Sequence, residues 1–195
     1  MSQAIFPGTP MIVGLGAQGS SVPCNTCYFN TNINGNATNV PSVDTYIPES
    51  AIQVTTLNVG SAFRWSFCIS KTAAGIATPQ FNIRSGTSAS TTDAALWNIV
   101  LATAQTAVVD TAWCEIVLTI GVPPGVGGSN NIHMSFYLIH NLAATGFSTQ
   151  QVQVQQSTST RTFTSMPVFF GVSCNPGSAG VWSFVTSLAL GMNLG

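Results

Sequence analysis

The strongest constraint on the fold of this chain is an alternation of apolar and polar residues with a period of two. Between positions 62 and 70, every second residue is large and apolar: Phe63, Trp65, Phe67 and Ile69. Successive side chains of a β-strand point to opposite faces, so this pattern places a row of large side chains on one face of a strand. No segment keeps the period of about 3.6 residues, with capping residues at its ends, that is typical of an α-helix.

Similar strand patterns recur along the rest of the chain, at Gln80–Arg84, Leu96–Leu101, Trp113–Ile120, Ile132–Ile139, Gln151–Gln155, Val168–Cys174 and Val181–Leu190. Turn-forming residues separate them, as in SGTSAST, GVPPGVGGSNN and NPGSAG. Many strands without helices to cover a parallel sheet favour two antiparallel sheets packed face to face. The sequence therefore predicts an all-β antiparallel β-sandwich. We expect a jelly roll, with an immunoglobulin-like sandwich as the alternative.

The first part of the chain has a different character. Residues 1–45 hold four prolines and the polar run NTNINGNATN, and they keep neither a helical nor a sustained strand period. We expect an extended N-terminal arm over residues 1–45, followed by the β-sandwich domain at 46–195. The arm also carries the apolar residues that are our candidates for docking on a partner protein: Ile5, Phe6, Met11, Ile12 and Val13.

Charged residues are scarce. Lys and Arg total 4 and Asp and Glu total 5 among 195 residues, whereas roughly a quarter of the residues are charged in an ordinary soluble domain. The cations stand singly, which argues against nucleic acid or an anionic membrane as the main partner. The apolar stretches are only long enough for strands, and the first ten residues do not resemble a signal peptide. A surface of hydroxyls and amides suits a protein packed against other subunits.

Candidates for catalysis are few. Asp110 and Glu115 are close in sequence, but we expect Asp110 in a solvated turn and Glu115 on a strand surface, paired with an arginine across the sheet. We expect His133 on the polar side of its strand and His140 hydrogen-bonded to the backbone of a turn. Neither histidine has a metal-ligand partner at the usual spacing, and no nucleophile motif is present. The sequence therefore predicts a non-enzymatic protein without metal or cofactor.

Two further motifs are weak. The G-x-G-x-x-G that begins at Gly14 is followed by Pro23 and no helix, so it does not indicate dinucleotide binding. Cys24 and Cys27 form a lone C-x-x-C, which we interpret as an ordinary pair of loop thiols. The remaining cysteines lie in apolar runs and are expected to be buried: Cys68, Cys114 and Cys174.

The tryptophans and one glutamine-rich strand leave alternatives open. Trp97, Trp113 and Trp182 lie in alternating strands and are expected in the core, although exposed tryptophans could instead line a glycan-binding groove. Gln151, Gln153 and Gln155 share one face of a strand, which faces either water or another subunit.

Several stretches together resemble a known group of proteins. They are IRSGTSASTTDAALW from Ile83, TAVVDTAWCEIVLTI from Thr106, HNLAATGFSTQ from His140 and NPGSAGVWSF from Asn175. This combination resembles a β-rich module of structural proteins of tailed bacteriophages, over roughly residues 80–190. The resemblance implies a β-sandwich component of the virion, often trimeric, and it includes no catalytic motif.

The leading hypothesis is a capsid decoration or cement protein that stabilises the phage head by binding across capsomers. Its partners would be the major capsid protein and two further copies of itself in a homotrimer. Its location would be the virion, after assembly in the host cytoplasm. The alternative is a tail or fibre-tip protein that recognises a glycan on the host surface.

Overall fold

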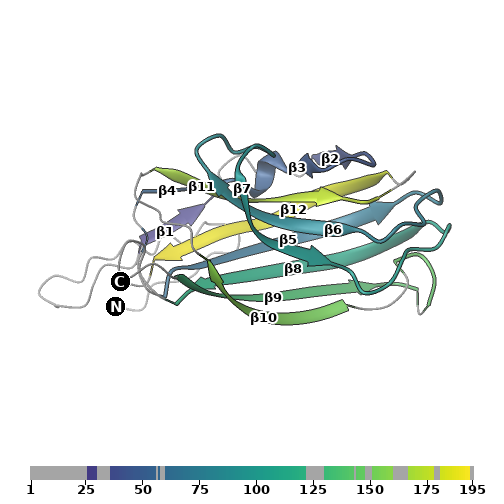
Figure 1. Ribbon diagram of the computed structural model, residues 1–195. Helices are drawn as coiled ribbons and strands as arrows, with labels where there is room; N and C mark the ends of the chain where they lie inside the picture. The colour runs from purple at the N-terminus through teal and green to yellow at the C-terminus, as the bar shows by residue number, and fades with distance from the viewer. Residues whose placement is uncertain are drawn as a thin grey trace, which may run out of the picture.

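The computed structural model describes residues 26–29, 36–55, 57, 60–121, 130–142, 144–147, 151–159, 167–177 and 181–193. They form a seven-stranded and a five-stranded sheet, both antiparallel, that pack face to face (Figure 1). Within these ranges the only helical element is the short 3-10 turn η1 (Pro48–Ser50). The predicted all-β antiparallel sandwich is therefore confirmed, while the jelly-roll connectivity stays a prediction.

The larger sheet has the strand order β1 (Thr26–Phe29), β12 (Trp182–Asn193), β5 (Ala62–Lys71), β8 (Asp110–Ile120), β9 (Asn130–His140) and β10 (Gln151–Ser159), and β2 (Ala37–Val40) also pairs with β12. The smaller sheet has the order β3 (Thr45–Tyr46), β11 (Val168–Asn175), β6 (Gln80–Gly86) and β7 (Ala94–Val100), and β4 (Ile52–Val54) also pairs with β11. Each strand that the alternating patterns predicted is present, with ends that differ by a few residues.

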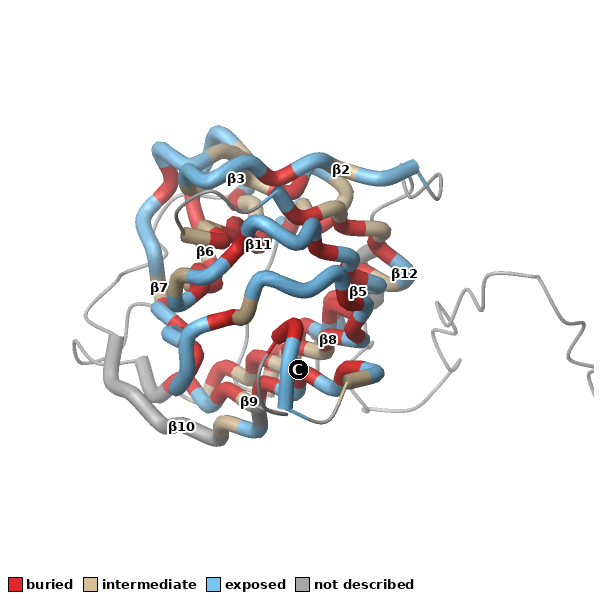
Figure 2. Tube along the Cα trace, turned by 90° about the vertical axis from the view of Figure 1, so that its right-hand side faces the viewer, coloured by how far each residue is buried: buried red, intermediate tan, exposed pale blue. Residues whose placement is uncertain are grey.

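The core lies between the two sheets and follows directly from the alternation. Along β8, buried and more exposed residues alternate without a break, and the view along the strands shows the larger sheet bending around buried residues (Figure 2). Aromatic rings join the two layers. Phe63 of β5 stacks on Phe170 of β11 with ring centroids 4.3 Å apart, and Phe81 of β6 meets Phe136 of β9 at 5.1 Å. Such pairs add to the hydrophobic gain from burial.

The expected arm needs a correction. Thr26–Phe29 pairs with the C-terminal part of β12, and Ala37–Val40 pairs with its N-terminal part. These residues belong to the sandwich, so an arm that extends to residue 45 is wrong for this stretch. The physical reason is that β12 is 12 residues long, and one of its edges would expose unpaired backbone groups without them. Strands of four residues are too short to show a period in the sequence.

The arm's candidate anchors (Ile5, Phe6, Met11, Ile12 and Val13) lie outside the described residues, as does Cys24, and their roles stay predictions.

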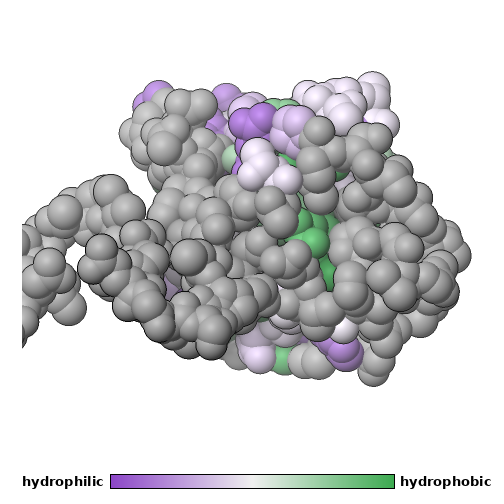
Figure 3. Space-filling view, turned by 90° about the vertical axis from the view of Figure 1, so that its left-hand side faces the viewer, coloured by the Kyte–Doolittle hydropathy of each residue, from purple (hydrophilic) through white to green (hydrophobic). Residues whose placement is uncertain are grey.

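The two ends of the sandwich are formed by opposite ends of the long strands. At the end near β4 and the C-terminal part of β12, hydrophobic residues are visible near the middle of the surface, with hydrophilic ones above them (Figure 3). The opposite end holds Lys71, Asp110 and His140, all of which are buried. Ser61, next to the residues of β5 that pair with the C-terminal part of β12, is also buried, so buried polar groups occur at both ends.

Candidate binding groove on the outer face of the larger sheet

The outer face of the larger sheet carries an apolar row that crosses five strands. In an antiparallel sheet, side chains that are register partners stand side by side on one face. Ala37 is the partner of Val185, Val185 of Cys68, Cys68 of Trp113, and Trp113 of Ile139. Trp113 is 41% exposed and Ile139 is 49% exposed. We call Ala37, Val185, Cys68, Trp113 and Ile139 the apolar row.

A second row, made of polar residues, runs beside the apolar row. It lies two residues along each strand, toward the end of the sandwich that holds Lys71, Asp110 and His140. Asn39 is the register partner of Ser183, Ser183 of Ser70, and Ser70 of Thr111. Asn141 completes the row, because its Nδ2 donates a hydrogen bond to Thr111 Oγ1 at 2.6 Å. We call these five residues the hydroxyl–amide row. Two residues along a strand separate the rows, a distance of about 6.8 Å.

A groove follows these two rows. One hollow of about 480 Å³ is lined by residues of both rows, among them Cys68, Trp113, Ile139, Thr111 and Asn141. A second hollow of about 330 Å³ shares Ser70 and Ser183 with the first and continues to Asn39, Val109 and Val181. The hollows therefore adjoin, and the hydroxyl–amide row runs between them.

The groove has no charged side chain available to a ligand among its described lining residues. Lys71 lines the second hollow, but its Nζ donates to the carbonyl oxygens of Thr106 and Val108 at 2.8 Å and of Thr72 at 3.1 Å. Burial lowers the pKa of Lys71, and the Asp110 carboxylate opposes this shift. On the other side of the apolar row, Arg64 and Glu115 bind each other at 2.6 Å, as the sequence predicted for Glu115.

The structure corrects the expectations for Asp110 and His140. Both side chains are buried, with exposed fractions of 1% and 0%, and His140 Nδ1 lies 2.8 Å from Asp110 Oδ2. Asp110 also accepts a hydrogen bond from the backbone N–H of Phe147 at 3.1 Å. Gly146 allows this contact, because it has a φ of +72° and the carboxylate occupies the space of a Cβ. The pair fastens Phe147 to β8, and His140 lies in the wall of the first hollow described above.

The thiols and indoles divide between the core and the surface. Cys114 and Cys174 are buried as predicted, and burial raises the pKa of both thiols. Trp97 and Trp182 are buried as predicted. The predictions for Cys68 and Trp113 are wrong, because both are exposed on the apolar row.

Parity along β8 is the signal that could have identified Trp113 as exposed. Ala112, Cys114 and Ile116 fix the even positions as the buried side of this strand. Trp113 occupies an odd position, whereas an ordinary core tryptophan would share the parity of the buried residues.

The remaining predictions for this face have mixed outcomes. His133 is exposed, as expected. Gln153 does not face water alone, because its Nε2 donates to the carbonyl oxygen of Val100 in the other sheet at 3.0 Å. Val152, from the opposite side of β10, is 62% exposed. The side chains of Gln151 and Gln155 lie outside the described residues.

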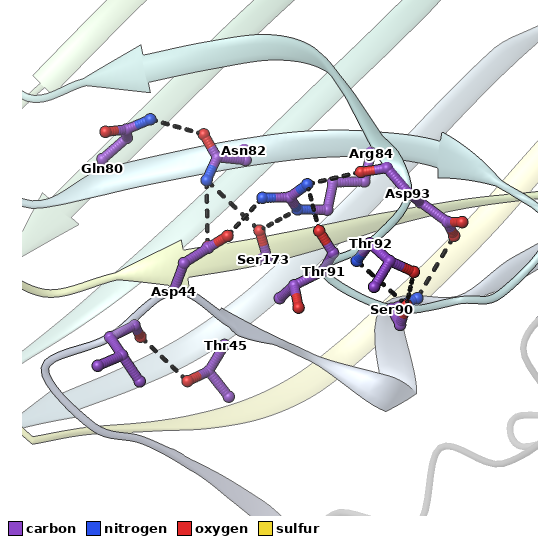
Figure 4. A network of polar contacts seen from close by, with 11 residues as sticks. Asp44, Thr45, Gln80, Asn82, Arg84, Ser90, Thr91, Thr92, Asp93 and Ser173 are labelled. Atoms are coloured by element: carbon purple, nitrogen blue, oxygen red, sulfur yellow. Dashed lines mark hydrogen bonds and ion pairs between the residues drawn. The ribbon is translucent and has the colours of Figure 1, made fainter.

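The outer face of the smaller sheet carries a different arrangement, which the sequence did not reveal (Figure 4). Arg84 forms an ion pair with Asp44, and its Nε donates to Ser173 Oγ at 2.7 Å. Its Nη1 donates to the carbonyl oxygens of Thr91 at 2.9 Å and Asp93 at 2.6 Å. The guanidinium is therefore used within the chain, and this network holds the sheet to its turns.

The described residues show no sign of a metal centre or a membrane-crossing helix. Within the ranges given above, no cluster of three or more His, Cys, Asp or Glu side chains could hold a metal ion. None of the described helical residues forms a helix long and apolar enough to cross a membrane.

Comparison with known proteins adds little. No protein-family model matches the chain, and no curated protein matches it. Among solved structures, a legume lectin-like domain from Entamoeba histolytica is similar over 86% of this chain and 97% of that chain, with 11% identity and a TM-score of 0.26. A likeness at this level does not bear on function.

Proposed function

We propose that this chain is a non-enzymatic structural subunit of a phage virion, and specifically a capsid decoration protein. It would act by burying surface against the major capsid protein and against copies of itself in a homotrimer. The arm residues Ile5, Phe6, Met11, Ile12 and Val13 are the proposed anchors on the capsid. Each apolar side chain buried at such a contact would contribute ~1.5 to 3 kcal/mol before the cost of ordering the arm.

The observation that supports this proposal is the use of the charged groups. Each charged side chain in the described ranges contacts a partner within the chain: Asp44 with Arg84, Glu49 with Thr38, Arg64 with Glu115, Lys71 with carbonyl oxygens, Asp93 with backbone N–H groups and Asp110 with His140. An ionic ligand site, or a general acid or base supplied by Asp, Glu or Lys, needs at least one such group directed at a ligand. A neutral surface suits a protein that works by contact alone.

The arm can be tested by deletion. Residues 1–25 are removed rather than 1–45, because Thr26–Phe29 and Ala37–Val40 are strands of the larger sheet. We expect the shortened chain to keep its β-rich circular dichroism spectrum and its melting temperature, and to lose sedimentation with capsids that lack the protein. Full binding by the shortened chain would overturn the role of the arm.

A second candidate function is recognition of a host glycan by a tail or fibre tip. The exposure of Trp113 in a groove is the observation that favours it. The number of copies in purified particles separates the two positions, because a decoration protein is present in many copies per particle and a tail-tip protein in few.

A further inference from the structure

We infer that the groove on the larger sheet binds a neutral oligosaccharide, with Trp113 as the platform on which one sugar ring stacks. This inference rests on the second candidate function, glycan recognition, and it does not depend on where in the virion the protein sits. The hydroxyl–amide row supplies the hydrogen bonds, and the second hollow receives the next sugar unit.

The first argument is the pairing of the two rows. A sugar ring has an apolar face of C–H groups and an edge of hydroxyls. Trp113 is flanked in the apolar row by Cys68 and Ile139, and it offers a flat surface for the C–H face. The hydroxyl–amide row lies about 6.8 Å away, where it can donate to and accept from the hydroxyl edge of the same ring. A purely apolar ligand would leave that row without partners.

The second argument is charge. Lys71 is bound to backbone carbonyl oxygens, and Arg64 is paired with Glu115. Among the described lining residues, an acidic sugar or a phosphate would find no free cation, and a basic ligand would find no free carboxylate. Transfer of a charged ligand group into such a site is unfavourable. The ligand therefore belongs to the neutral class.

The third argument is size. The adjoining hollows of about 480 and 330 Å³ fall in the range of small-molecule sites, roughly 300 to 1,000 Å³. A stable protein interface needs on the order of 800 Å² of continuous surface on each partner. On β5 and β8 the apolar row is only one residue deep, because polar residues follow on both sides, with Ser70 and Thr111 toward one end and Ser66 and Glu115 toward the other.

The fourth argument is preorganisation. Asn141 is held by two contacts with Thr111: its backbone N–H donates to the Thr111 carbonyl oxygen at 3.2 Å and its Nδ2 donates to Thr111 Oγ1 at 2.6 Å. The side-chain carbonyl of Asn141 and the hydroxyl proton of Thr111 remain for a ligand. Groups already fixed by the sheet lose little entropy on binding.

The test is retention on immobilised oligosaccharides. The full chain is applied to neutral oligomers of glucose, galactose and N-acetylglucosamine, and to sialylated and sulfated glycans as the acidic set. We expect binding to one or more neutral oligomers, and at least a tenfold weaker affinity for the Trp113→Ala variant. Trp113→Phe should keep part of the affinity, because it restores an aromatic face. Binding to acidic glycans only, or to none of the probes, would overturn the inference.

Tyr137→Ala is the matched control. Tyr137 lies on the same face, in the next row of β9, and is 38% exposed, but it does not line either hollow. We expect its glycan affinity to equal that of the wild type. An equal loss of glycan affinity in Tyr137→Ala and Trp113→Ala would indicate nonspecific adsorption to this face and would contradict binding in the groove.

A chemical probe gives an independent readout. Cys68 lies in the apolar row beside Trp113, so a bound oligosaccharide should slow its alkylation by iodoacetamide. Unchanged alkylation at a saturating concentration of the sugar would place the ligand elsewhere and refute the site.

The two proposals fail separately. Deletion of residues 1–25 should abolish capsid binding and leave glycan affinity intact, whereas Trp113→Ala should do the reverse. If Trp113→Ala instead abolished capsid binding or self-association and left glycan affinity unchanged, the groove would be a protein interface and the saccharide inference would be wrong.

Discussion

The outer faces of the two sheets are built in opposite ways. On the smaller sheet, the chain covers itself: the side chain of Tyr46 occupies the space over Gly171, that of Asp93 occupies the space over Gly86, and Arg84 lies partly buried among their neighbours. On the larger sheet, no described segment folds over Trp113 and Ile139, which stay about half exposed at 41% and 49%. The outer face of the smaller sheet is covered by contacts within the chain, whereas the outer face of the larger sheet is exposed around Trp113 and Ile139.

This difference shows how a chain with few charges uses them. The ion pair of Arg84 and Asp44 ties β6 to the segment before β3, and it is largely shielded from water. The pair of Arg64 and Glu115 lies on the open face, where Arg64 is 52% exposed. The same chemistry should therefore stabilise the two faces to different extents.

Among substitutions on the outer faces of the two sheets, the largest effect is expected from Arg84→Met. Loss of the guanidinium removes one donor from Asp44, Ser173 Oγ and two carbonyl oxygens, and among the described residues only Asn82 still donates to Asp44 and Ser173. We expect a loss of about 2 to 3 kcal/mol in the free energy of unfolding, measured by urea denaturation. Arg64→Met is the matched control and should cost less than about 1 kcal/mol. Equal losses in the two variants would remove the contrast between the faces.

The next largest loss of stability is expected at Gly171, which is covered by the side chain of Tyr46. A Cβ at this position would meet the hydroxyl and ring of Tyr46, so Gly171→Ala should lower the melting temperature by an amount that corresponds to about 1 to 3 kcal/mol. Adding Tyr46→Phe to the same chain should recover part of the loss, since it removes the atom that the Cβ would meet first. Strict additivity of the two substitutions would mean that Tyr46 does not cover Gly171.

A smaller effect is expected in alkali. Burial raises the pKa of Tyr46 well above its usual value, and the Asp93 carboxylate adds to the shift. Above a pH of about 10, the unfolded chain loses this phenolic proton while the folded chain keeps it. Stability should therefore fall as the pH rises, by up to about 1.4 kcal/mol per pH unit. Tyr46→Phe should flatten this dependence in urea titrations from pH 9 to 11.5, and an unchanged slope would contradict the burial.

The smallest effect on stability is expected from Trp113→Ala. Its indole lies on the uncovered face, so truncation should change the free energy of unfolding by less than about 1 kcal/mol. Trp182→Ala gives the comparison, because Trp182 is fully buried and its Nε1 donates to Gln105 Oε1 at 3.0 Å. A buried tryptophan of this kind costs about 3 to 5 kcal/mol when it is truncated. Similar losses for both tryptophans would mean that the outer face is covered.

The layers of the fold were predictable because the strands from Phe63 onward alternate strongly, and alternation alone determines which residues share a face. The groove was only partly predictable. Trp113 and Cys114 are adjacent and both apolar, so the pattern does not say which of them is buried until the parity of the whole strand is compared. The contact of Arg84 with Asp44 joins residues 40 positions apart, and no local pattern can indicate such a pair.

The place of β12 has a consequence for how the molecule can be made. This strand, Trp182–Asn193, lies between β5 on one side and β1 and β2 on the other. A ribosome releases the early strands before β12 has been made, so the larger sheet cannot close until β12 has also left the ribosome. Long-range pairing of this kind is slow. Until β12 pairs with them, the edges of β2 and β5 remain exposed. These strands carry few charges, so little electrostatic repulsion opposes their pairing with another chain.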